Sequence, residues 1–423
     1  MSNAFNKEER VIFEDEVGGF DDNCQANRFI STYKIGDVVG ARTGDIIWRT
    51  IPYIGRSYDG TDASNNFNDV TQLAVPATIG YARHSTSLMD ATELRDALQE
   101  NRLGKAATQK LASDINVAIL RMIAEQSTLV ITQSTAPTGF DDVALCDSAL
   151  NEVGIPADSR YLALSSRAYN AMASNLASRQ TMTGKPQNAY EKAYVGTIAS
   201  FETYKLDYGI RLPAAAGGNG ITISTLNTAG NYYTPVATSV AATGEVSNVD
   251  NRYQTVTVSS TTSVAAGDCF TIVAVNSVHH ITKEDTGQLK TFRVMKVVDS
   301  THLVISPPIV SNQVASDAST RYQNCVVNTK VSNSAIDFLN SVVTPAVNAF
   351  WFKDAFEIIP GRYAMPADAG PAVMRATTEQ GIELVMQKFY DINTMKTKYR
   401  WDIRFGLCCK QPEMAGLLLF NQT

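Results

Sequence analysis

The stretch VDNRYQTVTVSSTTSVAAGDCFTI at Val249–Ile272 decides how the fold is interpreted. In its middle, Val256 and Val258 alternate with threonines. Successive side chains of a β-strand point to opposite faces, so this alternation predicts a strand with one buried face. The turn signal AAGD at 265–268 and the apolar run after it predict a second strand. We therefore expect a β-hairpin in the middle of the chain.

Short strand signals continue on both sides of this stretch, while helix signals nearly vanish between 221 and 334. The strand-like runs are separated by turn signals and read ITISTL, YQTVTVSS, CFTIVAV, TFRVMKVV and HLVISPP. Many short strands at such spacing are typical of a sandwich or a small barrel. We expect an all-β unit here, inserted into a domain that mixes helices and strands.

The strongest helix signal lies before this unit, in DATELRDALQENRLGKAATQKLASDINVAILRMIAEQ from Asp90 onward. Leu111, Ile115 and Ile119 recur at steps of four and predict one apolar stripe along a long helix. Gly104 weakens the pattern, so we expect it to divide a short helix from a long one. The strand TLVIT at 128–132 follows.

Two segments at the start of the chain have a different character. Residues 1–43 show no clean period, which suits an extended arm lying on something else. Residues 44–84 contain two strand-like runs around the polar tip GRSYDGTDASNNFND, which predicts a projecting hairpin. The acidic residues of this tip lack the spacing and the closing Glu of a calcium loop.

The remaining regions predict an α/β host for the inserted unit. Helix, strand, helix and a strand pair follow one another over 138–220. After the inserted unit, SAIDFLNSVVTPAVNAF at 334–350 suggests that helix resumes, and the strands IELVMQKFY and WDIRFGL complete the host.

Composition excludes several classes of protein. A chain of 423 residues with a net charge of −6 is long enough for more than one unit and lacks a general basic surface for nucleic acid. No apolar run is long enough to cross a bilayer, and acids stand where a signal peptide needs an apolar core. Six scattered cysteines without a CxxC pair predict free thiols in a reducing cytoplasm and no metal site.

Catalytic motifs find no support in the sequence. No G-x-S-x-G occurs, and Cys146 or Cys325 with His84 or His302 would be a chance pairing of the kind any soluble protein offers. The glycines at 217–220 precede a strand instead of a helix, which argues against a phosphate loop. We expect no enzymatic activity and no cofactor.

The quoted stretch resembles part of the major coat proteins of the family typified by the short-tailed Salmonella phage P22. TFRVMKVVDSTHLVISPPIV, NAFWFKDAFEIIP, QPEMAGLLL and the earlier STLVITQS are similar to other parts of these proteins, in the same order and at matching intervals. The resemblance implies an α+β fold of the Hong Kong ninety-seven (HK97) capsid type, with an inserted β-barrel domain.

It also implies a division of the chain into six parts. These are an N-terminal arm (1–43), an extended-loop hairpin (44–84), a peripheral domain with a long spine helix (85–137), the first part of an axial domain (138–220), the inserted β-barrel (221–334), and a return through the axial and peripheral domains (335–423).

The function implied is that of a major capsid protein. Copies would assemble as pentamers and hexamers into the icosahedral shell that encloses the double-stranded DNA of a tailed bacteriophage. Partners would be further copies of the chain, a scaffolding protein and a portal during assembly, and DNA packaged without sequence specificity, with no membrane involved. Assembly would take place in the cytoplasm of the host bacterium, and the product would be part of the virion.

The resemblance places subunit contacts in two segments. In relatives, a charged loop of the insertion bridges capsomers, and by position it falls within 235–252. Its only charges here are Glu245, Asp250 and Arg252, so apolar or hydrogen-bonded contacts could replace electrostatic bridging. An alternative is a solvated loop in which Asp250 caps a turn.

The extended-loop tip carries the other candidate charges. Arg56, Asp59 and Asp62 are either interface groups or plain solubility groups. A second function class also stays open: a virion structural or adhesive protein whose β insertion binds a surface ligand such as a glycan. That function needs an exposed aromatic cluster, for which Tyr232 and Tyr233 are the one hint. A cellular nanocompartment shell is disfavoured, because those shells lack the insertion.

Overall fold

The structure is a computed structural model that falls into two compact units, each described by itself. Unit 1 comprises 1–47, 76–122 and 356–409, and unit 2 comprises 48–75, 123–355 and 410–423. The residues that the structure describes are 5, 7–33, 46–64, 66–90, 97–178, 195–206, 210–215, 220–224, 226, 232–328, 333–340, 343–363 and 372–422.

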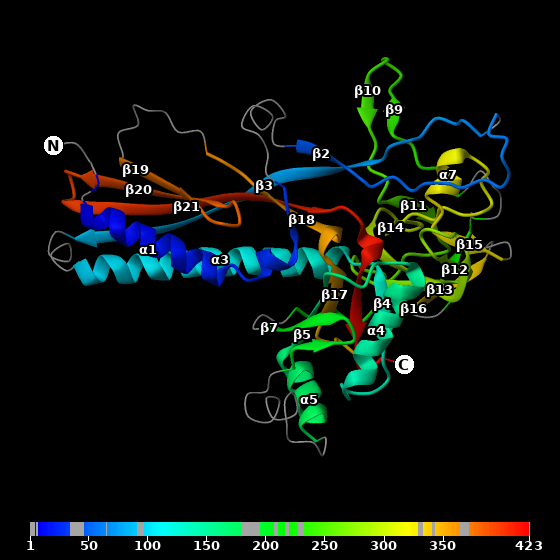
Figure 1. The fold of residues 1–423 in the computed structure, drawn as a ribbon, viewed down its shortest axis with the longest axis horizontal. Coiled ribbons are helices and arrows are strands. Elements are labelled where there is room, and N and C mark those ends of the chain that lie inside the picture. The colour runs from blue at the N-terminus through cyan, green and yellow to red at the C-terminus, as the bar shows by residue number, and fades with distance from the viewer. Residues whose placement is uncertain are drawn as a thin grey trace. The chain divides into compact units, whose positions relative to one another are not determined.

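Unit 1 contains a sheet of long strands with two helices running beside it (Figure 1). The strand order is β1-β18-β21-β20-β19, and β3 pairs with β21 on the side away from β20. The elements are α1 (Lys7–Asn23), η1 (Ala26–Phe29), β1 (Ser31–Thr32), β2 (Ile46–Thr50), β3 (Ala74–Asp90), α3 (Ala97–Gln126), β18 (Phe356–Pro360), β19 (Ala372–Thr377), β20 (Glu383–Asp391) and β21 (Lys396–Cys409). The ends of β2, β3 and α3 extend into unit 2.

The segment predicted as an irregular arm, 1–43, contains a helix of four to five turns, so the expectation of an extended conformation is wrong for α1. The buried side of α1 carries Glu9, Phe13, Glu16 and Phe20 at steps of four, three and four. This is helical spacing, but two of the four residues are acids. A search for apolar periodicity therefore could not find it.

Side chains of the sheet contact both of these buried acids. The indole Nε1 of Trp401 donates a hydrogen bond to Glu16 Oε2 at 3.0 Å. Glu9 forms an ion pair with Lys388 and accepts a hydrogen bond of 3.4 Å from the Tyr399 hydroxyl. A buried carboxylate is tolerated when it is paired in this way, so α1 can place acids on its covered face.

Two expectations about the long helix are also corrected. The strand β3 continues to Asp90, which pairs with Lys396, so helix does not begin there. Residues 91–96 lie outside the described residues. Gly104 does not divide α3, which runs unbroken through it. A Cβ at Gly104 would collide with the carboxylate of Glu16, so this glycine permits close packing of α1. The predicted stripe of Leu111, Ile115 and Ile119 is buried, as expected.

The host part of unit 2 is a six-stranded sheet in the order β4-β22-β17-β5-β7-β6, with helices α4 and α5. Its core includes apolar residues of α4, β5, α5 and β22. The elements are β4 (Leu129–Thr132), α4 (Phe140–Val153), β5 (Arg160–Ser165), α5 (Ser166–Ala177), β6 (Thr197–Ile198), β7 (Phe201–Leu206), β17 (Asn348–Phe352), η4 (Lys353–Ala355), η5 (Pro412–Met414) and β22 (Ala415–Leu419).

The other part of unit 2 is the predicted all-β unit, a sheet in the order β11-β14-β13-β12-β16-β8, with β15 paired to β12. A bridge between Ile223 and Val258 brings β8 back to the end of β11, so the sheet is nearly closed into a barrel. The elements are β8 (Thr222–Ile223), β9 (Thr238–Val240), β10 (Val246–Asn248), β11 (Gln254–Thr257), β12 (Cys269–Val278), β13 (Asp285–Val297), β14 (His302–Ser306), α7 (Asp317–Arg321), β15 (Cys325–Val327) and β16 (Ser334–Phe338).

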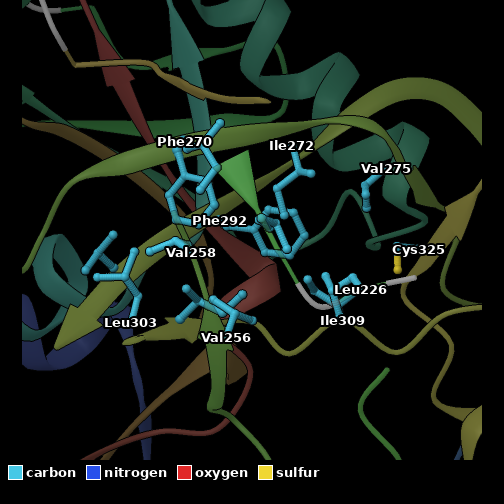
Figure 2. Close-up of a cluster of buried hydrophobic side chains, with 14 of the residues drawn as sticks. Leu226, Val256, Val258, Phe270, Ile272, Val275, Phe292, Leu303, Ile309 and Cys325 are labelled. Atoms are coloured by element: carbon cyan, nitrogen blue, oxygen red, sulfur yellow. The ribbon is translucent and has the colours of Figure 1, made fainter. Parts of the chain in front are cut away.

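The alternation of the quoted stretch has the predicted effect. Val256 and Val258 are buried in the barrel core together with Phe270 and Phe292 (Figure 2). Thr255 faces solvent. The predicted pairing of the two strands is wrong, however, because β14 and β13 lie between β11 and β12. The hairpin of β13 and β14 forms through a short turn, and the strands of the quoted stretch add to its two outer edges.

The helix expected at 334–350 is also absent from its described residues. Residues 334–338 form β16, whose Phe338 pairs with Phe270 of β12, and residues 348–352 form β17 in the host sheet. Ile336 is fully covered by the barrel core, so packing within the sheet outweighs the local helix signal.

Candidate subunit interfaces

A long loop, 51–73, joins β2 to β3 and contains the first three predicted site residues. Its ends come together where the Ile51 amide donates a hydrogen bond of 2.9 Å to the Leu73 carbonyl oxygen. No helix or strand is assigned among its described residues. Phe67 is 85% exposed, and Tyr53 and Val70 are also exposed. A polar loop that presents large apolar side chains to water is typical of a protein contact surface.

Arg56 lies against the inserted barrel. Its guanidinium Nη1 is 3.8 Å from Asp317 Oδ1 at the start of α7, and its Cζ lies 5.0 Å from the ring centroid of Tyr58. The side chain of Arg56 is therefore engaged within its own chain.

The acids of the same loop face solvent. Asp59 and Asp62 are both exposed. Asp62 Oδ1 accepts hydrogen bonds from the hydroxyl and the amide of Ser64, the latter at 3.0 Å, and these bonds lower the pKa of the carboxyl. Asp62 thus caps a local turn, and both acids remain available to solvent or to another molecule.

The second candidate segment, 235–252, forms a hairpin of β9 and β10 that is separate from the barrel sheet (Figure 1). Val240 and Val246 are directly paired across the two strands and are 68% and 63% exposed. The turn contains Glu245, which is exposed, and Gly244, whose positive φ of 85° suits glycine. The hairpin therefore presents an apolar pair and one acid.

The other two charges of this segment pair with each other at its base. Arg252 Nη2 lies 2.6 Å from Asp250 Oδ2, and Asp250 Oδ1 accepts a hydrogen bond of 3.1 Å from the Arg252 amide. Their side chains are only 13% and 22% exposed. This is the turn-capping arrangement considered from the sequence, and it leaves little of either charge for another subunit.

Sequence reasoning missed the residue that holds the hairpin in place, Asn251. Its Nδ2 donates to the carbonyl oxygens of Val236 at 2.8 Å and Val249 at 3.0 Å. Its Oδ1 accepts from the Val236 amide and the Tyr233 hydroxyl, both at 3.0 Å. A single asparagine in a loop carries no periodic signal, so nothing in the sequence pattern marked it.

The aromatic pair that favoured an adhesive function is not an exposed cluster. Tyr232 is buried, and its hydroxyl donates to the carbonyl oxygen of Leu226 at 3.1 Å. Burial, followed by the charge of Asp250, raises the pKa of Tyr233. Both residues therefore belong to the barrel and to the base of the hairpin.

The candidate thiols of the sequence are inert in this fold. Cys146 and Cys325 are fully buried, and burial raises the pKa of Cys325 to about 12. Within the described ranges, no group of three or more His, Cys, Asp or Glu residues is placed to hold a metal ion. The helices described are all too short or too polar to cross a membrane.

Comparison with known proteins identifies a family that matches almost the whole chain. A family model described as the P22 coat protein, gene protein 5, matches residues 1–421. Similar solved structures include the capsid of the cyanophage P-SCSP1u, which is 11% identical over 93% of this chain and 86% of that chain, with a TM-score of 0.46. The mature capsid of bacteriophage PhiM1 is 9% identical over 94% of this chain and 86% of that chain, with a TM-score of 0.43. The CUS-3 coat protein I-domain is 35% identical over 30% of this chain and 99% of its own length, with a TM-score of 0.21.

The family match confirms the expectations of fold class and function. The fold is the α+β HK97-type capsid fold with an inserted, nearly closed β-barrel, and the family is a structural one. The adhesive alternative is not favoured, because its aromatic cluster does not form. The chain belongs to the P22 coat protein family, and it is a major capsid protein that builds the shell of a bacteriophage virion.

Proposed function

We propose that copies of this chain form an icosahedral shell of pentamers and hexamers around the double-stranded DNA of a tailed phage, and that loop 51–73 and hairpin β9–β10 make the contacts between copies. The observation that carries this proposal is the exposure of Phe67 and of the pair Val240 and Val246 at the surface of a coat protein. Burial of such side chains favours association, and a shell repeats each contact many times.

The contact made by the hairpin is mainly apolar. Asp250 and Arg252 neutralise each other at its base, so Glu245 is the remaining charge of the segment. Val240 and Val246 together offer apolar area on one face of the hairpin. Removing such area from water supplies roughly 25 cal/mol per Å², which is enough for a weak contact that the shell repeats.

In loop 51–73 the basic residue is paired within the chain, and the acids are not engaged in ion pairs with other residues that the structure describes. Arg56 has a partner inside the chain, whereas Asp59 and Asp62 face solvent. We assign any charged contact of this loop with another copy to the two acids.

The six-part division of the chain is retained with one adjustment. The arm, the extended loop, the peripheral domain, the two axial parts and the inserted domain keep their order along the chain. Because β16 pairs with β12, we place the end of the inserted domain at 338 instead of 334.

The remaining partners follow from the role of a coat protein. We propose that a scaffolding protein and a portal take part in assembly in the host cytoplasm, and that the chain has no catalytic role. A net charge of −6 suits a shell that encloses DNA without gripping it, because dense Lys and Arg would bind phosphate strongly.

Sedimentation of the protein coexpressed with its scaffolding partner tests this function, followed by negative-stain microscopy of the fast fraction. We expect closed shells of uniform size. A protein that stays monomeric at every concentration with the partner present would contradict the proposal.

A further inference from the structure

We infer that the inserted barrel holds loop 51–73 within its own subunit through the segment 317–322, and thereby presents Phe67 to a neighbouring copy. The presentation to a neighbour rests on the proposed function, whereas the contact within the subunit stands on its own. Two polar contacts pin the loop, one near each of its ends.

The first contact joins Arg56 to Asp317. Arg321 Nε lies 2.6 Å from Asp317 Oδ2 and fixes the carboxylate from within α7. The hydrogen bond from Arg321 leaves Asp317 Oδ1 buried with no hydrogen-bond partner. The guanidinium of Arg56, 3.8 Å away, is the ion-pair partner of that oxygen, so Arg321 and Arg56 contact different oxygens of one carboxylate.

The second contact joins Tyr322 to the other end of the loop. Its hydroxyl donates a hydrogen bond of 2.9 Å to the carbonyl oxygen of Thr71. Burial raises the pKa of this tyrosine, so the hydroxyl remains a donor at neutral pH. Tyr322 directly follows Arg321, so one short segment of the barrel contacts both the beginning and the end of the loop.

Apolar packing beneath the loop is incomplete, which makes the polar contacts more important. A cavity of about 110 Å³ lies at the base of the loop. Its walls include Ile51, Ile54 and Leu73 of the loop and Pro307, Val310 and Tyr322 of the barrel. Because these walls do not interdigitate fully, apolar contact alone leaves the loop free to shift.

The result is a loop held at both ends with its middle presented to solvent. Between Arg56 and Thr71 the chain carries Phe67 at 85% exposure. An anchored side chain loses less conformational entropy on binding than one on a free loop, so pinning the ends favours association with a neighbouring copy.

Hydrogen exchange and limited proteolysis of the unassembled full-length subunit test the contact directly. In the variant carrying both Arg56→Gln and Tyr322→Phe, we expect the Ile51 amide to exchange about tenfold faster and cleavage within 57–70 to increase similarly. Asp59→Asn is the matched control, because Asp59 lies in the same loop and faces solvent. Exchange and cleavage equal to wild type in the double variant would overturn the inference.

A double-mutant cycle separates a contact within the subunit from a contact between subunits. If Arg56 acts through Asp317, Arg56→Gln should change loop exchange clearly in the wild type and very little in an Asp317→Asn background. Additive effects of the two substitutions would contradict the inference. Because exchange is measured before assembly, shells of normal yield from the double variant would count against the proposed role of the loop while leaving the pinning intact.

Discussion

Loop 51–73 and hairpin β9–β10 are both exposed, yet they are held in different ways. The hairpin is held by its own strand pairing and by Asn251 at its base. The loop has no regular pairing in its described middle part and depends on α7 and Tyr322 of the barrel. The two segments meet where Ala74, just after the loop, forms a bridge with Asp250, just after β10. The hairpin is part of the inserted domain, and the loop contacts that domain through Arg56 and Thr71, so both depend on its stability.

The comparison shows that the charges of a sequence do not reveal which of them pair within the chain and which face solvent. Half of the six charged residues predicted as interface groups have ion-pair partners within the chain, and the other half face solvent. The internally paired residues are Arg56, Asp250 and Arg252, and the solvent-facing residues are Asp59, Asp62 and Glu245. The strongest candidates for contact are instead the exposed apolar side chains of Phe67, Val240 and Val246.

The largest effect is expected where the hairpin is held. Asn251→Ala removes four hydrogen bonds, each with a net value of roughly 1 kcal/mol, so the free energy of unfolding of the barrel should fall by about 4 kcal/mol. Urea denaturation measures this change. Asn248→Ala, on the exposed strand β10, is the matched control and should have an effect below about 0.5 kcal/mol. Equal effects of the two substitutions would show that Asn251 does not hold the hairpin in place.

Acid should destabilise the inserted barrel, which both segments contact, through protonation of His280. Burial lowers the pKa of His280 from 6.5 to about 4, with Lys290, Lys283 and His279 acting in the same direction and the nearby charge of Glu413 opposing them. Between these two pH values the unfolded chain binds the proton and the folded chain does not. Stability is thus fully present above pH 6.5 and is lost as the pH falls toward 4, by up to about 3 kcal/mol.

Denaturation at a series of pH values checks this expectation. His280→Gln should flatten the dependence between pH 6.5 and pH 4, whereas other acid-sensitive groups would continue to act at lower pH. A variant with the same slope as wild type would show that His280 is not responsible.

A smaller effect is expected for an apolar residue of the hairpin. Val240→Asp should lower the yield of shells by about tenfold, because a carboxylate without a partner is costly to bury, and should leave subunit stability unchanged. Ser247→Asp places the same charge on the opposite face of the hairpin and should assemble normally. Sedimentation of equal amounts of both variants distinguishes them. Equal losses of shell yield in the two variants would show that the added charge itself impairs assembly, whichever face of the hairpin carries it.

The smallest effect is expected for the loop. Phe67→Ala should reduce the rate of assembly about fivefold, because only part of one aromatic side chain is lost from the contact. Phe67→Tyr keeps the ring and should assemble at the wild-type rate. Light scattering during assembly measures both rates. An alanine variant that assembles normally would place this loop outside the contacts between copies.

Much of the fold could be predicted from local pattern. The alternation around Val256 located the barrel, because one face of a strand must meet a core. The stripe of α3 was equally visible, as Leu111 and Ile115 repeat with helical spacing. By contrast, α1 was missed because Glu9 and Glu16 occupy half of its buried stripe.

The candidate interfaces were less predictable. Position along the chain identified both segments as candidates. Arg56 meets its partner Asp317 only through folding, however, and residues so distant in sequence carry no local signal. Asn251 acts through four hydrogen bonds to a turn whose geometry is not encoded in any period. Contacts that form only on folding therefore decided which of these charges are paired within the chain.

The most direct measurement is a high-resolution structure of the assembled shell. We expect Val240 and Val246 of each copy to be buried against another copy, Phe67 to be covered by a neighbour, and Arg56 to remain beside Asp317 of its own chain. A shell in which hairpin β9–β10 and Phe67 both face solvent would contradict the assignment of these two segments as contacts between subunits.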